Sequence, residues 1–329
     1  MASTGDSTHR VALDKAIKAM PDTGRDIRAR CKETAHSDSR TDPATAPVEH
    51  VLTLDCPEAP GIVLAVSRFL VEHGSDIIDN QQFGDRRDGH FFMRVRFATV
   101  GSENTPQTLR RDFAAVAASF TMRWHLEPVS TRRRVLIMVS RYGHCLNDLL
   151  FRTRSGDLPI DVVAVVSNPR DHETLVAWHD IPFFHVPVTA ATKSEAEARL
   201  LEIVDSCDPD LVVLARYMQV LSDDLCTRLA GRMINIHHSF LPSFKGAKPY
   251  HQAHDRGVKL VGATAHYVTA DLDEGPIITQ EVIDVDHSHT PDDLAAIGRD
   301  AESAALARAV RWHCEGRVFV QGRRTVVLR

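Results

Sequence analysis

The stretch from residue 135 to residue 236 contains five short apolar runs that alternate with segments of helical character. The runs read VLIMVS, IDVVAVVS, PFFHVPV, DLVVLA and RMINI. Strands that are apolar at successive positions are typical of a parallel sheet covered by helices on both faces. Asp171 and Ser222 precede two of the intervening helices and are predicted to cap them. The sequence therefore predicts an α/β domain with a mainly parallel sheet.

The chain continues with a short helical segment, two strand-like segments, a long helix and a closing hairpin. They read PYHQAHDRG, VKLVGATAHYVT, PIITQEVIDV, PDDLAAIGRDAESAALARAVRWHCEG and RVFVQGRRTVVL. Ligands of parallel α/β sheets bind outside the carboxyl ends of the strands. Polar residues that directly follow a strand of this domain are therefore the first candidates for a functional site.

A different pattern precedes this domain. Strand-like HVLTLDC is followed by a helix with one apolar stripe, APGIVLAVSRFLVEHG, and then by two strands, SDIIDNQQF and HFFMRVRFAT, around the turn GDRRDG. A second helix, with Pro106 in its first turn, and the strand MRWHLEP complete the unit. The order βαββαβ predicts a ferredoxin-like domain.

Length and composition divide the chain into three parts. A chain of 329 residues is long enough for two domains. Residues 1–46 are polar and mixed in charge, so we predict a disordered extension there. Residues 47–130 form the ferredoxin-like domain in this division, and residues 131–329 form the larger α/β domain.

Charge and composition argue against several classes of protein. A net charge of −5 gives no attraction to nucleic acid or to an acidic membrane surface. No apolar run is long enough to span a membrane, and the N-terminus lacks the apolar core of a secretory signal. The six cysteines are scattered without a C-x-x-C pair, which is typical of reduced cysteines. We therefore expect a cytoplasmic protein with no nucleic-acid partner and no membrane partner.

The segment NIHHSFLPSFKG gathers polar side chains at the carboxyl end of a buried strand. It begins at Asn235, and His237 lies two residues further on. On a strand these two side chains point to the same side of the sheet. An amide donor beside an imidazole is suited to hold a carbonyl oxygen as it becomes an oxyanion.

A second polar segment, GATAHYVTADLDEGPII, places His266 at the end of a strand and Asp273 in the loop that follows. A carboxylate at this edge of the sheet can act as a general acid or base. Each of these residues alone has an ordinary alternative, a structural histidine or a solvated loop charge. Their combination with Asn235 and His237 is what indicates catalysis.

The start of the N-terminal domain, LTLDCPEAPGIVLAVSRFLVEHGSDIIDNQQ, resembles an ACT domain, which is a small regulatory βαββαβ module. The matching features are Cys56 and Pro57, Gly61 at the helix entrance, and Asn80 on the second strand. The resemblance implies an amino-acid effector near Gly61 and Asn80, or a role in forming a homo-oligomer. The same glycine and proline can also simply shape a turn.

Together, the two polar segments resemble the signature of the folate-dependent formyltransferase family, from Asn235 to Ile278. The resemblance implies a Rossmann-like domain that binds 10-formyltetrahydrofolate. It also implies that Asn235, His237 and Asp273 are catalytic and that His266 supports Asp273. Asn235 and His237 would stabilise the formyl oxygen, while Asp273 would move the protons.

The turn VSRYGHCLNDLL, after the first strand of the larger domain, bears on the formyl acceptor. Relatives with a phosphate-bearing amine acceptor have a glycine-rich turn here, whereas only Gly143 remains in this chain. With the ACT-like domain, this resembles the branch of the family in which water is the acceptor. That branch implies hydrolysis of 10-formyltetrahydrofolate to formate and tetrahydrofolate, which supplies purine synthesis and balances the one-carbon pool. Glycine and methionine are the effectors that it implies.

The segment that follows the run DLVVLA is the predicted pterin-binding site. By family resemblance it is lined by Met218, Gln219, Val220 and Leu221, partly through backbone groups. Val220 and Leu221 can instead begin the core face of a helix. The chain also contains three close histidine pairs, but no cysteine joins them, and an oxyanion role accounts for His237. We therefore expect neither a metal nor a cofactor.

Two other functions stay open at this stage. The chain can be a formyltransferase with an unidentified amine acceptor, or a regulator without catalysis that binds folate or an amino acid. The set Asn235, His237 and Asp273 argues against a pure binding protein, because such a protein has no need of a carboxylate at that position. Formate release in the absence of any amine separates a hydrolase from a transferase.

Overall fold

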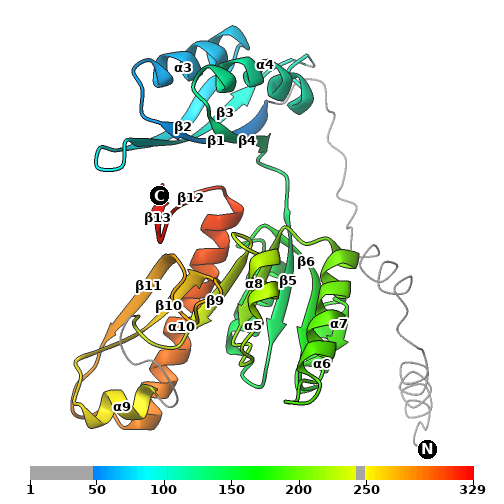
Figure 1. Ribbon diagram of the computed structural model, residues 1–329, viewed down its shortest axis with the longest axis vertical. Coiled ribbons are helices and arrows are strands. Elements are labelled where there is room, and N and C mark those ends of the chain that lie inside the picture. Colours follow the sequence, from blue (N-terminus) through cyan, green and yellow to red (C-terminus); the bar gives the residue numbers. More distant parts are fainter. Residues whose placement is uncertain (1–46, 102, 242–248) are drawn as a thin grey trace, which may run out of the picture.

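The computed structural model describes residues 47–101, 103–241 and 249–329, which form two folded units (Figure 1). The extension predicted for residues 1–46 lies outside the described residues. The N-terminal unit is α/β with strands on one side and helices on the other. The larger C-terminal unit is built around a mainly parallel sheet.

The N-terminal unit has the predicted βαββαβ order. Its antiparallel sheet has the strand order β2-β3-β1-β4, and α3 and α4 cover one face (Figure 1). The buried core includes Phe69, Phe97 and Phe113, and burying a side chain of this size contributes about 1.5–3 kcal/mol. Its elements are β1 (Val48–Pro57), α3 (Ile62–Glu72), β2 (Asp76–Asp85), β3 (His90–Thr99), α4 (Pro106–Ser119) and β4 (Arg123–Pro128).

The larger unit has a seven-stranded sheet with the order β11-β10-β9-β8-β5-β6-β7. All neighbours from β9 to β7 are parallel, whereas β10 is antiparallel to both β9 and β11. Its strands are β5 (Arg133–Val139), β6 (Ile160–Ser167), β7 (Phe183–His185), β8 (Leu211–Ala215), β9 (Met233–His237), β10 (Leu260–Tyr267) and β11 (Ile277–Asp284). The predicted parallel α/β domain is thus confirmed.

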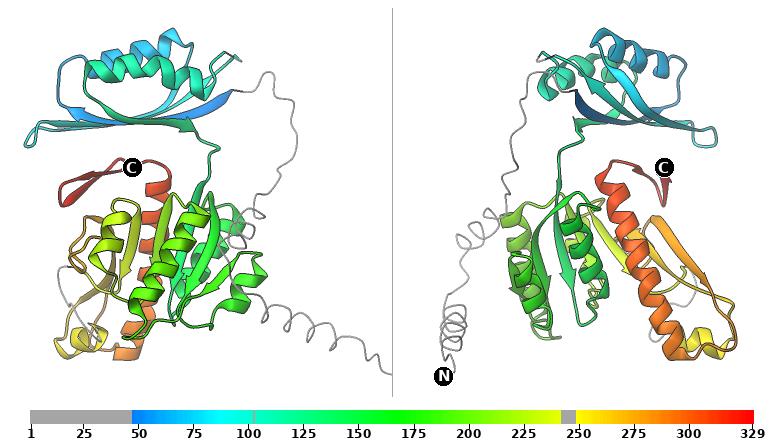
Figure 2. Two further views of the ribbon diagram at one scale, coloured as in Figure 1. Left: turned by 45° about the vertical axis from the view of Figure 1, so that its right-hand side comes forward. Right: turned by 180° about the vertical axis from the view of Figure 1, so that it is seen from behind.

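Helices cover both faces of this sheet (Figure 2). One apolar cluster joins the sheet to α5, α6 and α10, and a second cluster joins its other face to α7 and α8. The helices are α5 (His144–Ser155), α6 (Glu173–Trp178), α7 (Lys193–Cys207), α8 (Asp223–Arg228), α9 (Pro249–Asp255) and α10 (Pro291–Cys314). None of the described helices is long and apolar enough to cross a membrane.

Two of the sequence predictions about this unit differ from the structure. Ser222 caps α8 as predicted, since its side chain accepts from the Leu225 N–H, but the prediction of an Asp171 cap is wrong. α6 begins one residue later, behind His172, and has no side-chain cap. The strand predicted from PFFHVPV is limited to β7, because Pro182 and Pro187 offer no N–H to the ladder.

The described cysteines also differ in part from expectation. Cys56, Cys145, Cys226 and Cys314 are free thiols, as predicted. Cys207 is disulfide-bonded, so the prediction of a reduced thiol is wrong there. The spacing of cysteines along the sequence could not predict this disulfide bond, because it does not determine which cysteines lie close together in the fold.

A C-terminal hairpin, β12 (Val318–Gln321) and β13 (Arg324–Val327), lies between the two units (Figure 2). The ring centroid of Phe319 is 5.5 Å from that of Phe92 on the N-terminal sheet. Arg324 forms ion pairs with Asp85 and Asp88 at the β2–β3 turn. The hairpin thus fastens the N-terminal unit to the larger one.

Candidate active site

The register of three strands sets the first part of the site. β9 lies between β8 and β10, and Asn235 is paired with Leu214 on one side and His266 on the other. His237 is likewise paired with Thr264 of β10. The two conspicuous polar segments of the sequence are therefore neighbouring strands, which brings Asn235, His237 and His266 to one end of the sheet.

A buried threonine fixes the chain as it leaves β9. The Thr264 hydroxyl is fully buried, donates to the Ser239 carbonyl at 2.9 Å and accepts from the Leu241 N–H at 3.1 Å. The Gln280 amide donates to the Leu241 carbonyl at 3.0 Å. These bonds restrain the backbone that follows His237 and limit how far its imidazole can move.

The loop between β10 and β11 carries Asp273 and is held closely against the end of β10. A Cβ added to Gly275 would lie 1.8 Å from the Tyr267 carbonyl oxygen, so only glycine permits this approach. The Tyr267 N–H donates to the Pro276 carbonyl at 3.0 Å. Asp273 itself has a φ of 56°, a left-handed conformation that few residues other than glycine adopt.

The four predicted catalytic and supporting residues lie in contact. His237 Nδ1 is 3.2 Å from Asp273 Oδ2, and His266 Nε2 is 3.6 Å from Asp273 Oδ1. Asn235 Nδ2 is 3.3 Å from His266 Nε2, while His266 Nδ1 donates to the Tyr267 carbonyl at 2.9 Å. An acid, two imidazoles and an amide thus form one cluster.

The electrostatics of the cluster favour an ionised carboxylate and an available imidazole nitrogen. Burial acts to raise the pKa of Asp273, but hydrogen bonds from His237 and His266 outweigh it and hold that pKa well below its usual range. His237 Nε2 is buried and has no hydrogen-bond partner among the described residues. Burial, together with Arg216 and His237, lowers the pKa of His238 to about 4.

A cavity of about 260 Å³ lies beside this cluster and is lined by Asn235, His237, His266 and Asp273. The four residues predicted to bind the pterin also line it: Met218, Gln219, Val220 and Leu221. The Met218 side chain is 53% exposed and the Val220 side chain 59% exposed, which is unusual for large apolar residues and typical of a ligand-binding surface. The Met218 N–H already donates to Ser140 Oγ at 2.9 Å.

The two predicted effector residues lie in the N-terminal unit and on different elements. Gly61, with a φ of 94°, precedes α3, and nothing surrounds the position that a Cβ would take. Asn80 is exposed on β2 and lines a shallow, open surface together with β13. An effector site made from both residues stays a prediction.

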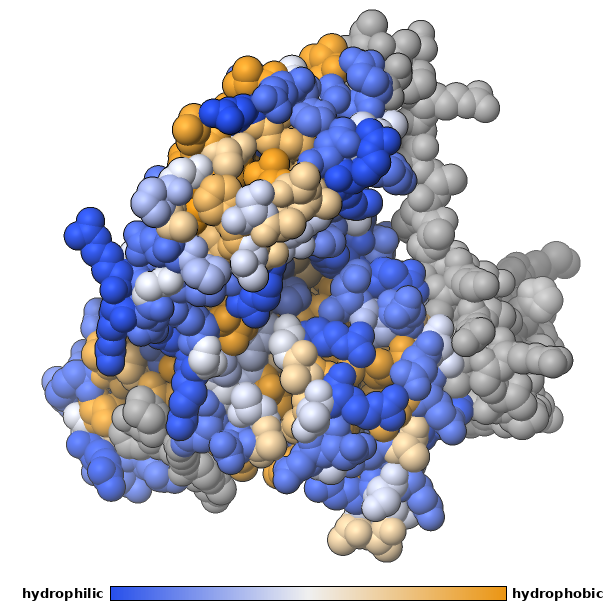
Figure 3. Space-filling model, turned by 45° about the horizontal axis from the view of Figure 1, so that its top comes forward, coloured by the Kyte–Doolittle hydropathy of each residue, from blue (hydrophilic) through white to orange (hydrophobic). Residues whose placement is uncertain are grey.

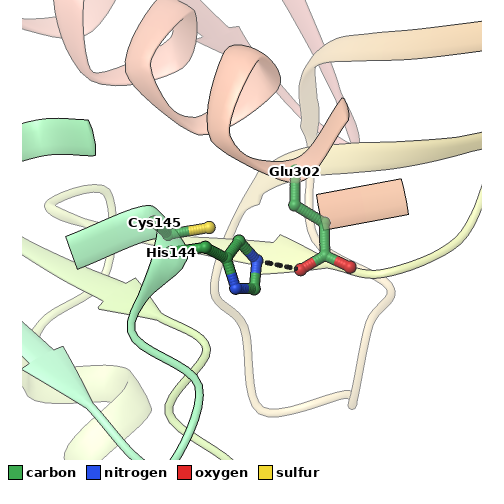
Figure 4. A group of neighbouring side chains, drawn as sticks. All are labelled: His144, Cys145 and Glu302. Carbon is green, nitrogen blue, oxygen red and sulfur yellow. Dashed lines mark hydrogen bonds and ion pairs between the residues drawn. The ribbon is translucent and has the colours of Figure 1, made fainter. Parts of the chain in front are cut away.

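A second polar cluster includes Arg216 of the cavity lining, and no local pattern in the sequence predicted it. Two of its members, His144 and Glu302, are drawn in Figure 4. Glu302, which is 1% exposed, accepts a hydrogen bond from Tyr250 at 2.9 Å and lies 2.7 Å from His144 Nε2. Arg216 Nε is 3.3 Å from the same carboxylate. The sequence feature that could have indicated this cluster is Glu302 itself, an acidic residue on the alanine-rich buried face of α10.

Part of this second cluster has a composition found in metal sites. The ligand atoms of His144, Cys145 and Glu302 all lie within 4.8 Å of one another (Figure 4). Arg216 already offsets the charge of the Glu302 carboxylate, however, and burial and Glu302 raise the pKa of the Cys145 thiol. Because a thiol binds metal as its thiolate, these charges favour an ion-pair network over a metal site.

Residues 133–310 match the family model described as formyl transferase. A protein named formyltetrahydrofolate deformylase from Corynebacterium sp. (strain P-1) is 60% identical over 86% of this chain and 99% of its own length. The protein of that name from Bacillus subtilis (strain 168) is 46% identical over 84% of this chain and 92% of its own length.

Solved structures give the same result. The formyltetrahydrofolate deformylase of Burkholderia mallei has a TM-score of 0.82 and 52% identity, and covers 86% of this chain and 100% of its own. Glycinamide ribonucleotide transformylase 1 of Symbiobacterium toebii has a TM-score of 0.57 and 32% identity, with 60% of this chain and 95% of its own covered. The chain belongs to the formyl transferase family. Within that family it groups with the formyltetrahydrofolate deformylases, which it matches over nearly their whole length.

Proposed function

We propose that the protein hydrolyses 10-formyltetrahydrofolate to formate and tetrahydrofolate. The observation that carries this proposal is the position of the Asp273 carboxyl group, which lies between two imidazoles at the edge of a cavity with exposed apolar walls. The names of the relatives agree with this substrate. The resulting formate would supply purine synthesis and balance the one-carbon pool.

The apolar side of the cavity suits the pterin ring. Met218 and Val220 come from the segment after β8, and Leu272, 63% exposed, comes from the catalytic loop. Burying these side chains against a flat heterocycle would remove apolar surface from water. This burial would stabilise the complex by about 25 cal/mol for each Å² buried. The pterin would thus lie between the β8 segment and the loop that carries Asp273.

The amide and the imidazoles suit the formyl oxygen. The Asn235 amide nitrogen lies 3.3 Å from His266 Nε2 and carries two N–H donors. One of these N–H groups would therefore be available to donate to the formyl oxygen. His237, whose Nδ1 pairs with Asp273, would present Nε2–H to the same oxygen as negative charge develops on it.

Asp273 would transfer the protons. Its lowered pKa keeps it ionised in neutral solution, so it can accept the proton of the attacking water. The new C–O bond forms at the formyl carbon, the C–N bond to the folate breaks, and the proton passes to the leaving nitrogen directly or through water. A carboxylate with a low pKa is a weak base, so the reaction also depends on the oxyanion donors.

We also propose that the reaction requires neither a metal nor a cofactor. Asp273 is already paired with two imidazoles, and Glu302 with a guanidinium group, so the acids of both clusters have cationic or donor partners. Formate release that is unchanged by dialysis against a chelator would support this. A loss of activity that added Zn²⁺ restores would refute it.

The N-terminal unit is proposed to be a regulatory ACT-like domain that binds an amino acid, with glycine and methionine as candidates, and assists self-association. Apolar side chains gather on its outer surface (Figure 3), and on α3 the residues Val63, Leu64 and Val71 are exposed. Sedimentation with and without each amino acid, together with the rate of formate release, tests both roles.

The test of the main proposal measures formate and tetrahydrofolate released from 10-formyltetrahydrofolate with no amine in the solution. We expect one formate for each tetrahydrofolate, at a rate that saturates with substrate. Release that occurs only after an amine is added would identify a formyltransferase. Binding without turnover would identify a regulatory protein.

A further inference from the structure

Four polar side chains from distant elements meet beside the cavity, where the strand order of the sheet reverses. In the sheet order, β6 and β7 lie on one side of β5, while β8 and β9 lie on the other. Open α/β sheets bind ligands at such a reversal point, outside the carboxyl ends of the strands. Here Arg216 follows β8, His144 begins α5 behind β5, and Glu302 reaches them from α10.

These side chains are tightly connected. The buried Glu302 carboxylate contacts His144 at 2.7 Å, the Tyr250 hydroxyl at 2.9 Å and Arg216 Nε at 3.3 Å. α10 carries Gly298 opposite the tyrosine, where a Cβ would lie 2.0 Å from the Tyr250 hydroxyl oxygen. The fold therefore leaves room for Tyr250 to reach Glu302, which fits a built cluster rather than a chance contact.

The cluster also places a negative charge near the start of α5. Gly143 precedes this helix, and its first turn contains no acidic residue and no side-chain cap. A helix N-terminus attracts phosphate and carboxylate groups. Because Glu302 contacts the first residue of α5, His144, it already provides an anion there. The guanidinium of Arg216, 5.6 Å from the Tyr142 ring centroid, lies over that ring.

Arg216 connects this cluster to the reaction site. It lines the same cavity as His237 and Asp273, and its side chain is 10% exposed. Its backbone has a φ of 64°, which is rare outside glycine. His238, next to the catalytic His237, lies with its ring centroid 6.4 Å from that of Tyr250. Arg216 thus forms part of the cavity wall beside the two histidines, and Glu302 pairs with it.

We propose that Arg216, held by Glu302 and through it by His144 and Tyr250, determines the formyl acceptor by excluding an amine from the cavity beside His237 and Asp273 while admitting water. The inference rests on the proposed hydrolysis. Arg216 is the specificity-determining residue of the set, since it alone both lines the cavity and pairs with Glu302.

The test removes the arginine and offers an amine. Arg216→Gly keeps the left-handed backbone, removes the guanidinium from the cavity wall and leaves the Glu302 carboxylate available to accept a hydrogen bond from a neutral amine, whose lone pair is the nucleophile. Glycinamide is the probe. Its nitrogen would bond to the formyl carbon as the C–N bond to the folate breaks, and its proton would pass to the folate nitrogen. The products are N-formylglycinamide and tetrahydrofolate.

The readout is the ratio of N-formylglycinamide to formate at increasing glycinamide concentration. We expect only formate from the wild type and from the control Arg170→Gly. The Arg170 side chain is 62% exposed, so this control removes an arginine from the surface. We expect Arg216→Gly to raise the ratio at least tenfold, and guanidinium ion to lower it again. A purely structural role would change the total rate without changing this ratio.

Other outcomes overturn the inference. A folded Arg216→Gly variant that makes only formate would show that the cluster does not select the acceptor, and a raised KM alone would make Arg216 a substrate-binding residue. If that variant does not fold, Arg216→Asn also tolerates the left-handed backbone and shortens the side chain in the cavity wall, and an unchanged ratio there is equally decisive. Wild-type protein that forms no formate without an amine would instead refute the proposed function.

Discussion

His237 Nδ1 lies 3.2 Å from Asp273 Oδ2, although the two residues belong to a strand end and to a separate loop. The pair exists because β9 and β10 are antiparallel neighbours and the loop after β10 folds back over their ends. An imidazole oriented in this way keeps one nitrogen on the carboxylate and leaves the other for the substrate. The pair is thus the centre of the proposed reaction.

Asp273→Asn is expected to slow formate release by about 10²–10⁴-fold, which is the usual contribution of a general acid or base. Asparagine tolerates the left-handed backbone at this position, so the fold should be retained. The measurement is the initial rate of formate release at saturating substrate. Asp271→Asn, an exposed acid in the same loop, is the matched control and should retain the wild-type rate. Equal rates for both variants would remove Asp273 from the mechanism.

Gly275→Ala is expected to displace the loop that carries Asp273. Its Cβ would lie 1.8 Å from the Tyr267 carbonyl oxygen, so the loop must move, at a cost of about 1–3 kcal/mol. A misplacement near 1 Å lowers rates about 10²-fold. Gly257→Ala is the control for a glycine-to-alanine change outside this loop, because it adds backbone strain at a φ of 62° but its Cβ meets nothing within 4 Å. Comparable rate losses in both variants would argue against the steric explanation.

Much of the fold and the first half of the site could be predicted from the sequence, because both depend on local patterns. Apolar runs without alternation identify buried parallel strands, and period-two spacing places Asn235 and His237 on one side of β9. The structure adds the register, which pairs Asn235 with His266. The roles of these residues rest on the family resemblance and stay predictions.

The second cluster was not predictable, because it depends on how distant elements pack. Glu302 and Arg216 lie on α10 and after β8, and no local pattern signals that a long helix will bring the two together. The Asp171 cap was wrong for a similar reason. The Glu173 N–H, at the start of α6, already donates to the Arg170 carbonyl at 3.1 Å. This backbone turn cannot be read from the identity of Asp171.

His238→Gln is expected to flatten the pH dependence of stability. The folded-state pKa of His238, lowered to about 4 by burial and by Arg216, lies below the unfolded value of about 6.5. The unfolded chain therefore takes up a proton that the folded chain does not, and stability falls from pH 6.5 toward pH 4. Urea titrations at pH 7, 6, 5 and 4 measure this loss, on the order of 2–3 kcal/mol in the wild type. A parallel loss in the variant would assign it to other groups.

Arg324→Ala is expected to release the C-terminal hairpin from the N-terminal unit. The Arg324 guanidinium lies 2.5 Å from Asp85 Oδ2, and that carboxylate side chain is only 9% exposed, so losing the cation leaves a nearly buried charge. We expect hydrogen exchange in β12, β13 and the β2–β3 turn to become about tenfold faster, which corresponds to ~1.4 kcal/mol. Arg323→Ala is the control, because the Arg323 side chain is 82% exposed in its ion pair with Glu274. Exposed ion pairs contribute only about 0–1 kcal/mol to stability. Equal acceleration in the two variants, measured by mass spectrometry, would show that the Asp85 contact does not fasten the two units.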